Sequence, residues 1–367
     1  MKICMVLGAH FSYAKGGAEI QADILANELI KRGHEIHYVC FGSENVGTPK
    51  KIRKDYYLYR VKRPYKNMGF LCYLNRRFIH DLIDKIKPDI IYQRGAFPFG
   101  DIISVYGRSR RISVVSGISM EIMCKKNKID VSLRTIPDIL DNHMRVRYFK
   151  KSDLIISQTE LQKKLLKKTY GVDSIIIPNV HFVPDPPFNK KTPPIISWVA
   201  NIKRLKQPEI FLKLAKELAD TDANFIMAGR PACGKFQRSF ENEVDALPNV
   251  TYLKEISFEG TNELIKESSI FVNTSTTEGF PNTFIQSWMR ATPVVSLNSD
   301  PNNILKNHKI GFHSKSLPKM AEDIRYLLEN EDVRFDMGER ARTYAIKNFD
   351  VEKIIVRYEH LLTELTE

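Results

Sequence analysis

The segment TSTTEGFPNTFIQSW, residues 274–288, carries a single carboxylate, Glu278, in a short polar stretch. The apolar run at residues 270–273 precedes it and apolar residues at helical spacing follow it, which predicts a strand, a loop and a helix. Open α/β sheets bind ligands in loops at the carboxyl ends of their strands. A carboxylate there can accept hydrogen bonds from the hydroxyl groups of a polyol. We therefore expect Glu278 to bind a ligand, the alternative being an acid that only caps the following helix.

The residues after Glu278 extend the same predicted site. The start of the helix would present backbone N–H groups to the ligand, and Gln286, more than one turn further along, would face it from the helix. The predicted ligand-binding residues of this segment are Glu278, Gly279, Phe280, Asn282, Thr283 and Gln286.

A second predicted contact is the cationic loop ANIKRLKQPE, residues 200–209. It places Lys203, Arg204 and Lys206 between a predicted strand and a predicted helix. Cations beside a helix N-terminus suit a diphosphate, which spreads its charge over several oxygens. The alternative is a solvated basic loop.

A glycine pair, Gly16 and Gly17, precedes the first predicted helix in the stretch KGGAEIQ. Glycine lets the backbone approach a ligand closely, and a helix N-terminus offers N–H groups to an anion. A plain turn is the alternative interpretation. Because the pattern is not GxGxxG, it does not indicate a dinucleotide.

The elements that position these residues follow from the hydrophobic pattern, which alternates strands and helices along the chain. Repeated βαβ units indicate parallel sheets with helices on both faces. The segment PDPPFNKKTPP holds five prolines and predicts a stiff linker. We therefore expect an α/β protein of two facing Rossmann-like domains with a ligand cleft between their strand ends. Its predicted parts are residues 1–183, the linker 184–194, residues 195–350 and a final helix at 351–367.

The composition is typical of a globular cytoplasmic protein. The 367 residues are 43% hydrophobic and 27% charged, which suits two soluble domains. No apolar run approaches the length of a membrane span, and the opening MKICMVLGAHF predicts a strand rather than a signal peptide. The five cysteines contain no CxxC pair and favour reduced thiols. The acidic DTD at residues 220–222 is predicted to be a solvated turn, so we expect no metal site.

The net charge of +13 indicates an anionic partner, namely nucleic acid, an anionic membrane surface or a phosphorylated substrate. Residues 50–77 hold ten Lys and Arg against one acid, with tyrosines interleaved. We predict that this basic aromatic segment docks on anionic lipid, the alternative being a solvated face.

Three segments resemble family 4 of the glycosyltransferases. They are GGAEIQADILANELIKRGHEIHYV near the start, SDLIISQTELQKKLLKKTYGVDSIIIPN before the linker and EGFPNTFIQSWMRATPVVS in the second half. The resemblance covers nearly the whole chain and implies the GT-B architecture, in which the final helix crosses back to the first domain. It also implies transfer of a sugar from a nucleotide donor with retention of configuration, without a metal ion or cofactor.

The resemblance assigns roles to single residues. Glu278 matches the first acid of the E-x7-E signature, which holds donor-sugar hydroxyls, and Gln286 stands at the second, which holds the nucleotide ribose. An amide can still bond to ribose hydroxyls, so we expect Gln286 to bind them. Lys206 matches the diphosphate lysine, which makes Glu278 and Lys206 the predicted catalytic pair.

The chain departs from the family pattern at two places. Asn201 replaces the usual arginine of the cationic loop, where Lys203 and Arg204 can substitute for it. Ser116 stands where the family often has a histidine that contacts the sugar or its leaving group.

The function that the resemblance implies is sugar transfer to a lipid-linked or polysaccharide acceptor in cell-surface glycan biosynthesis, such as lipopolysaccharide or capsule. The expected partners are a nucleotide-sugar donor, this acceptor and the inner face of the membrane. Two alternatives stay open. One is a nucleotide-sugar epimerase of similar architecture. The other is a nucleic-acid-binding protein that uses the basic segment, which leaves the EGFPNTFIQ loop unexplained.

Overall fold

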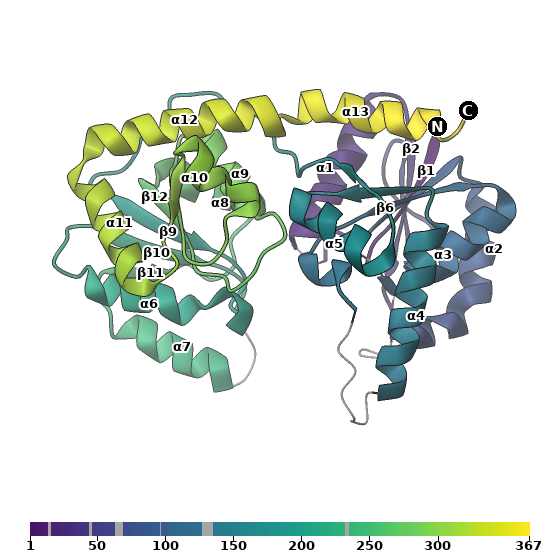
Figure 1. The fold of residues 1–367 in the computed structure, drawn as a ribbon, viewed down its shortest axis with the longest axis horizontal. Helices are drawn as coiled ribbons and strands as arrows, with labels where there is room; N and C mark the ends of the chain where they lie inside the picture. The colour runs from purple at the N-terminus through teal and green to yellow at the C-terminus, as the bar shows by residue number, and fades with distance from the viewer. Residues whose placement is uncertain (14–15, 44–45, 63–68, 96, 127–134, 232–234) are drawn as a thin grey trace. The chain divides into compact units, whose positions relative to one another are not determined.

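The computed structural model describes the chain apart from residues 14–15, 44–45, 63–68, 96, 127–134 and 232–234. The described chain divides into two compact units (Figure 1). The first unit comprises Met1–Val180 and Glu352–Glu367, and the second comprises His181–Val351. Each unit has its own sheet and its own hydrophobic cores.

The first unit is built on an eight-stranded sheet in the order β3-β4-β2-β1-β5-β6-β7-β8. Its neighbouring strands are parallel except β3 and β4, which pair antiparallel at one edge. Successive residues of β1 point to opposite faces of the sheet and so enter different cores. Ile3 and Met5 belong to one core, and Cys4 and Val6 belong to the other. The strands are β1 Lys2–Val6, β2 Glu35–Phe41, β3 Lys50–Arg53, β4 Tyr56–Val61, β5 Ile90–Arg94, β6 Ser113–Gly117, β7 Leu154–Ser157 and β8 Ile175–Ile176.

Helices cover both faces of this sheet. α1 and α13 pack into one core through Leu25 and Ile355, and α2 and α3 pack into the other through Ile83 and Ile103. The helices are α1 Gly17–Lys31, α2 Arg76–Ile86, α3 Phe97–Arg110, α4 Thr135–Lys151, α5 Glu160–Tyr170 and α13 Val351–Glu364, with 3₁₀ turns η1 Gly69–Asn75 and η2 Glu121–Cys124.

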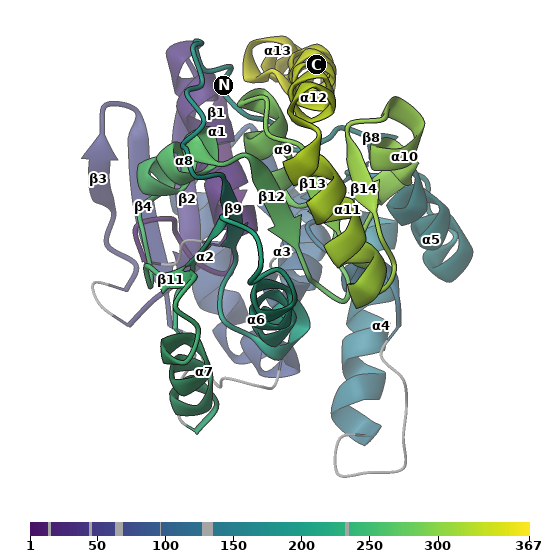
Figure 2. The ribbon, with the colours of Figure 1, turned by 90° about the vertical axis from the view of Figure 1, so that its left-hand side faces the viewer.

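The second unit has a six-stranded parallel sheet in the order β11-β10-β9-β12-β13-β14. Along β12, Ile270 and Val272 enter the core beneath α6 and α11, whereas Phe271 enters the core beneath α9 and α12. Figure 2 shows α6 and α11 in front of this sheet. The strands are β9 Ile195–Val199, β10 Asn224–Ala228, β11 Val250–Tyr252, β12 Ile270–Asn273, β13 Val294–Ser296 and β14 Gly311–His313. The helices are α6 Pro208–Glu217, α7 Lys235–Asp245, α8 Phe258–Glu267, α9 Asn282–Met289, α10 Ile304–His308, α11 Leu317–Glu329 and α12 Glu331–Phe349, with 3₁₀ turns η3 Arg204–Lys206 and η4 Pro301–Asn303.

The predicted α/β architecture with parallel sheets is confirmed. The basic aromatic segment forms additional elements that the sequence analysis did not predict. It forms the antiparallel pair β3 and β4, then η1, and α2 begins at Arg76. Charged residues such as Lys51 and Arg53 are typical of an edge strand, where they discourage pairing with another chain. Residues 63–68 of the segment lie outside the described chain.

The proline-rich segment belongs to the second unit. The half-buried side chain of Lys190 donates hydrogen bonds from its ammonium to the carbonyl oxygens of Lys266 at 3.1 Å and Arg290 at 2.9 Å and to the hydroxyl of Thr292 at 2.6 Å. Because α8 and α9 end beside these carbonyls, a cation suits the negative ends of both helix dipoles. Lys190 therefore anchors the segment to the two helices.

Candidate functional site

Two loops of the second unit meet at the carboxyl ends of neighbouring strands. The β9 loop, residues 200–207, follows β9, and the β12 loop, residues 274–281, follows β12; the two strands pair in parallel. The backbone N–H of Thr276 donates to the carbonyl oxygen of Leu205 at 2.9 Å. The hydroxyl of Thr274 lies 2.7 Å from the carbonyl oxygen of Lys206. The two loops therefore form one surface.

The side chains of Lys206 and Glu278 form an ion pair across this junction. Their exposed fractions are 24% and 13%, so both charged groups are partly removed from water yet open to a ligand. An ammonium beside a carboxylate can bind two different groups, a phosphate on the cation and a sugar hydroxyl on the carboxylate. The structure thus brings together the two residues predicted to be catalytic. Their direct pairing was not predicted.

Polar contacts with neighbouring segments hold the β12 loop in position. The indole Nε1 of Trp198, inside β9, donates to the hydroxyl of Thr274 at 2.8 Å. The amide of Asn298, which follows β13, donates to the carbonyl oxygen of Ser275 at 3.2 Å. Gln207 adopts a left-handed backbone with φ of 46°, a strained conformation that clusters at ligand sites when a non-glycine residue adopts it. The loop that carries Glu278 is therefore preorganised by its neighbours.

The start of α9 lies four residues beyond Glu278. Pro281 precedes the helix without a side-chain cap, and Asn282 and Thr283 are half-buried in its first turn. The ring of Phe280 is buried, 5.2 Å from the ring of Phe349 between centroids, and Gly279 is buried beside it. Phe280 therefore anchors the loop in the core, and only its backbone is placed to contact a ligand.

Gln286 lies deeper than predicted. Only 3% of the residue is exposed, and its side-chain Nε2 donates to Oδ1 of Asn262 in α8 at 2.8 Å. The side chain therefore links α9 to α8. A ribose contact by Gln286 stays a prediction.

Ser116, the residue at the family's histidine position, is fully buried in the first unit. Its hydroxyl lies in β6, 2.7 Å from the hydroxyl of Ser152. A buried hydroxyl with an internal partner does not reach a ligand, so the structure gives Ser116 a packing role.

The other cations of the β9 loop, Lys203 and Arg204, are exposed. The loop that follows β10 packs against the β9 loop at Gly229. A Cβ atom added at Gly229 would lie 1.7 Å from the carbonyl oxygen of Ala200. The N–H of Ile202 also donates to the carbonyl oxygen of Arg230 at 3.0 Å. Residue 229 must therefore be glycine for the two loops to touch, a close approach visible only in three dimensions.

The glycine pair belongs to the first unit, at the start of α1. Gly16 is the N-cap residue and Gly17 the first residue of the helix. The carboxylate of Glu19 folds back over this end of the helix. A Cβ atom added at Gly16 would lie only 2.3 Å from Oε2 of Glu19. An anionic ligand there would have to displace an acid of the same helix.

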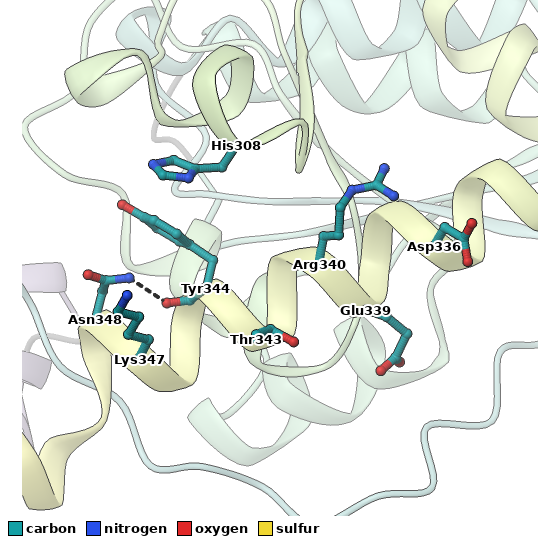
Figure 3. A pocket seen from close by; sticks show the side chains of 8 residues that line it. All are labelled: His308, Asp336, Glu339, Arg340, Thr343, Tyr344, Lys347 and Asn348. Carbon is teal, nitrogen blue, oxygen red and sulfur yellow. Dashed lines mark hydrogen bonds between the residues drawn. The ribbon is translucent and has the colours of Figure 1, made fainter.

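A cavity of about 680 Å³ lies elsewhere in the second unit, between α10 and α12. Figure 3 shows His308 over Tyr344, with 4.3 Å between ring centroids, and Asn348 bonded to the Tyr344 carbonyl. Acids and bases both line this cavity, and no predicted site residue does. Across the described ranges, no group of three or more His, Cys, Asp or Glu side chains is arranged to hold a metal ion.

Family models match both halves of the chain. The model of the Glycosyltransferase Family 4 matches residues 15–180, and the model of Glycosyl transferases group 1 matches residues 183–344. An uncharacterized glycosyltransferase of Haemophilus influenzae is 21% identical and covers 95% of this chain and 96% of its own. The N-acetyl-alpha-D-glucosaminyl L-malate synthase of Bacillus anthracis is 22% identical, covering 94% and 93%.

Solved structures share the fold at low sequence identity. Sucrose-phosphate synthase from Thermosynechococcus elongatus has a TM-score of 0.80 at 15% identity, covering 99% of this chain and 98% of its own. Anabaena Alr3699/HepE, solved with UDP-glucose, has a TM-score of 0.76 at 15% identity, covering 99% and 100%. WaaG, a glycosyltransferase involved in lipopolysaccharide biosynthesis, has a TM-score of 0.73 at 14% identity, covering 98% and 99%.

Proposed function

The chain belongs to glycosyltransferase family 4, and on this premise we propose that it transfers a sugar, with retention of configuration, from a nucleotide-sugar donor to a lipid-linked or polysaccharide acceptor in cell-surface glycan biosynthesis. The observation that carries the proposal is the Lys206–Glu278 pair at the junction of the β9 and β12 loops. The pair places a cation that can bind a diphosphate beside a carboxylate that can bind sugar hydroxyls. A nucleotide-sugar contains both the diphosphate and the sugar.

The proposed reaction needs charge stabilisation more than a nucleophile. The bond between the anomeric carbon and the diphosphate oxygen breaks, and its electron pair stays on the diphosphate. The acceptor hydroxyl oxygen attacks the same face of the sugar, and its proton passes to the departing diphosphate. Lys206, with Lys203 and Arg204 nearby, would stabilise the developing negative charge without a metal ion or cofactor.

Donor binding would also release the carboxylate. A diphosphate that approaches Lys206 competes with Glu278 for the ammonium, since both are anionic acceptors. Once the cation binds phosphate, the carboxylate is free to accept hydrogen bonds from the sugar hydroxyls. The phosphate contact and the sugar contact are then coupled.

The donor and the location are proposed from relatives and from charge. The UDP-glucose bound to the Anabaena structure supports a nucleotide-sugar, with UDP the first base to test. The involvement of WaaG in lipopolysaccharide biosynthesis supports a cell-surface glycan acceptor. Among the described residues, no helix combines the length and apolarity needed to cross a bilayer. We propose a cytoplasmic enzyme that associates peripherally with the inner face of the membrane.

A thermal-shift screen against UDP-, GDP- and ADP-sugars tests the donor. A ligand at a hundred times its dissociation constant should add roughly 2.7 kcal/mol to the stability of the folded protein. Product analysis with and without a glycan acceptor then tests the reaction. Sugar on the acceptor supports transfer, whereas an altered donor sugar without any acceptor supports the epimerase alternative and contradicts the proposal.

A further inference from the structure

Thr274 makes a buried polar contact that the proposed reaction does not use. It is the first residue of the β12 loop, and its side chain is fully buried. The neighbouring strands β9 and β12 (Figure 2) pair as far as Ser197 and Phe271. Beyond this pair, the indole Nε1 of Trp198 donates to the hydroxyl of Thr274 at 2.8 Å. A side-chain contact therefore continues the link between the two strands towards their loops.

The directions of the hydrogen bonds at Thr274 follow from its partners. An indole N–H can only donate, so the hydroxyl oxygen of Thr274 accepts from Trp198. The single hydroxyl proton is then left for a carbonyl oxygen. That of Lys206 lies 2.7 Å from the hydroxyl, and that of Gln207 lies 3.0 Å from it. Thr274 therefore links a core side chain to the main chain of Lys206.

The main chain of Lys206 is bonded through both of its polar groups. Its N–H donates to the carbonyl oxygen of Lys203 at 2.8 Å, and its carbonyl oxygen accepts from Thr274. The carbonyl oxygen of the preceding residue, Leu205, accepts from the N–H of Thr276 in the β12 loop. Because the backbone on either side of its Cα is held, the direction in which the Lys206 side chain leaves the backbone is fixed.

The β12 loop thus holds Lys206 at two points. Glu278 of this loop pairs with the ammonium, and Thr274 of the same loop binds the main chain. A donor affects the two contacts differently. Its diphosphate competes with Glu278 for the ammonium, whereas the buried hydroxyl of Thr274 is out of its reach. The contact with Thr274 therefore persists when the ion pair is replaced.

We propose that Thr274 is a positioning residue that keeps Lys206 directed at the diphosphate once the donor has displaced Glu278 from the ammonium. The inference rests on the proposed function, because it takes Lys206 to bind the diphosphate. Without the hydroxyl, the carbonyl oxygen of Lys206 and the indole N–H of Trp198 each lose a partner, and the turn η3 that ends at Lys206 is held less firmly. A misplacement of about 1 Å can slow an enzymatic reaction on the order of a hundredfold.

Thr274→Val tests the proposal, because it removes the hydroxyl and keeps the shape of the side chain. Calorimetric titration with UDP and the transfer rate at saturating donor measure its effect. We expect both affinity and rate to fall at least about tenfold, and Thr274→Ser, which keeps the hydroxyl, to stay within about twofold of the parent. Thr274→Ala repeats the test should the valine variant fail to fold.

Thr292→Val is the matched control. Thr292 is also fully buried, and its hydroxyl also accepts from a side chain, that of Lys190, and donates to a carbonyl oxygen, that of Ile265. The same substitution there removes a similar pair of hydrogen bonds away from the β9 and β12 loops. We expect a comparable loss of thermal stability, with UDP affinity and transfer rate like those of the parent.

A double-mutant cycle with Lys206→Met separates positioning from a general loss of stability. If Thr274 acts through Lys206, Thr274→Val should change UDP affinity less than about twofold once the ammonium is absent. Equal losses in both backgrounds would overturn the proposal. It would also be overturned by a valine variant that behaves like the parent, or by a serine variant that loses as much as the valine variant.

Amide hydrogen exchange tests the positioning without any ligand. In Thr274→Val, peptides that cover residues 200–207 should exchange faster than in the parent, and peptides elsewhere in the second unit should not change. Parent-like exchange in residues 200–207, or an increase spread evenly over the unit, would overturn the inference. A parent that binds no UDP and transfers no sugar would contradict the proposed function instead, and the exchange result would still decide whether Thr274 holds Lys206.

Discussion

The ammonium of Lys206 and the carboxylate of Glu278, 72 positions apart in the chain, form an ion pair where the β9 loop meets the β12 loop. Each charge is partly withdrawn from water, so each gains more from its partner than an exposed charge would. A donor that replaces one partner changes the surroundings of the other. Substitutions at the two positions should therefore have different effects on nucleotide binding and on transfer.

Replacing Glu278 by alanine removes the predicted sugar contact and the counter-charge of Lys206. We expect transfer to slow on the order of a hundredfold or more, because the sugar is no longer oriented as charge develops. Affinity for the nucleoside diphosphate should be unchanged or higher, since the carboxylate no longer competes for the ammonium. Transfer kinetics and calorimetric titration measure the two effects. Glu259→Ala, an exposed acid in the first turn of α8, is the matched control and should change neither. A folded Glu278→Ala protein with the parent rate would contradict a role of this acid in transfer and leave it only the ion pair with Lys206.

Replacing Lys206 by methionine keeps the length of the side chain and removes its charge. A hydrogen bond to a charged group contributes about 1.5–3 kcal/mol, so the nucleoside diphosphate should bind roughly ten- to a hundredfold more weakly. Lys203→Met, at an exposed position of the same loop, should weaken binding less. Calorimetric titration measures the affinity of both variants for the nucleoside diphosphate. Equal losses of affinity would mean that the loop acts only through its summed charge.

Changing Gln286 to glutamate restores the acid that the family usually has. The Nε2 atom of Gln286 donates to Asn262, and the amide of Asn262 can rotate to donate its own N–H to a carboxylate. We therefore expect a small loss of stability and transfer within about threefold of the parent, a difference of about 0.6 kcal/mol in the barrier. Thermal melting and transfer kinetics measure these quantities. A large loss of both would mean that the packing of α8 against α9 does not accept the charge.

The buried imidazole of His181 should make the second unit sensitive to acid. Burial lowers the pKa of His181 to about 4, below its ordinary value of 6.5. The unfolded chain then binds the proton more readily than the folded chain, so stability falls as the pH drops from 6.5 towards 4. Over that range the loss from this residue reaches about 3 kcal/mol.

His181→Phe tests this pH dependence, because it keeps the aromatic contact with Phe258 and removes the titrating group. Denaturant unfolding between pH 7 and pH 4 should show a shallower loss of stability than in the parent. His360→Gln, at an exposed position of α13, serves as the control and should keep the parent slope. Identical slopes for the parent and His181→Phe would contradict the prediction.

The local structure around Glu278 and Lys206 was predictable because it depends on short stretches of sequence. The apolar run before Glu278 and the helical spacing after it are local patterns, and they define a strand, a loop and a helix without reference to the rest of the chain. The cations of the β9 loop follow in the same way from the strand before them and from Pro208, which begins α6. The β3–β4 pair was missed because charged residues such as Lys51 and Arg53 obscure the pattern of an edge strand.

The sequence by itself determined the α/β alternation, the family and the loops in which Glu278 and Lys206 lie, because periodicity and motif spacing act over a few residues. Only the tertiary structure decided the partners of the polar groups. It paired Lys206 with Glu278, bonded Gln286 to Asn262 and buried Ser116 against Ser152. Each of these outcomes depends on the packing of side chains from different turns, strands or helices. A buried polar group must take whichever partner that packing provides, since leaving it unbonded costs its full desolvation energy.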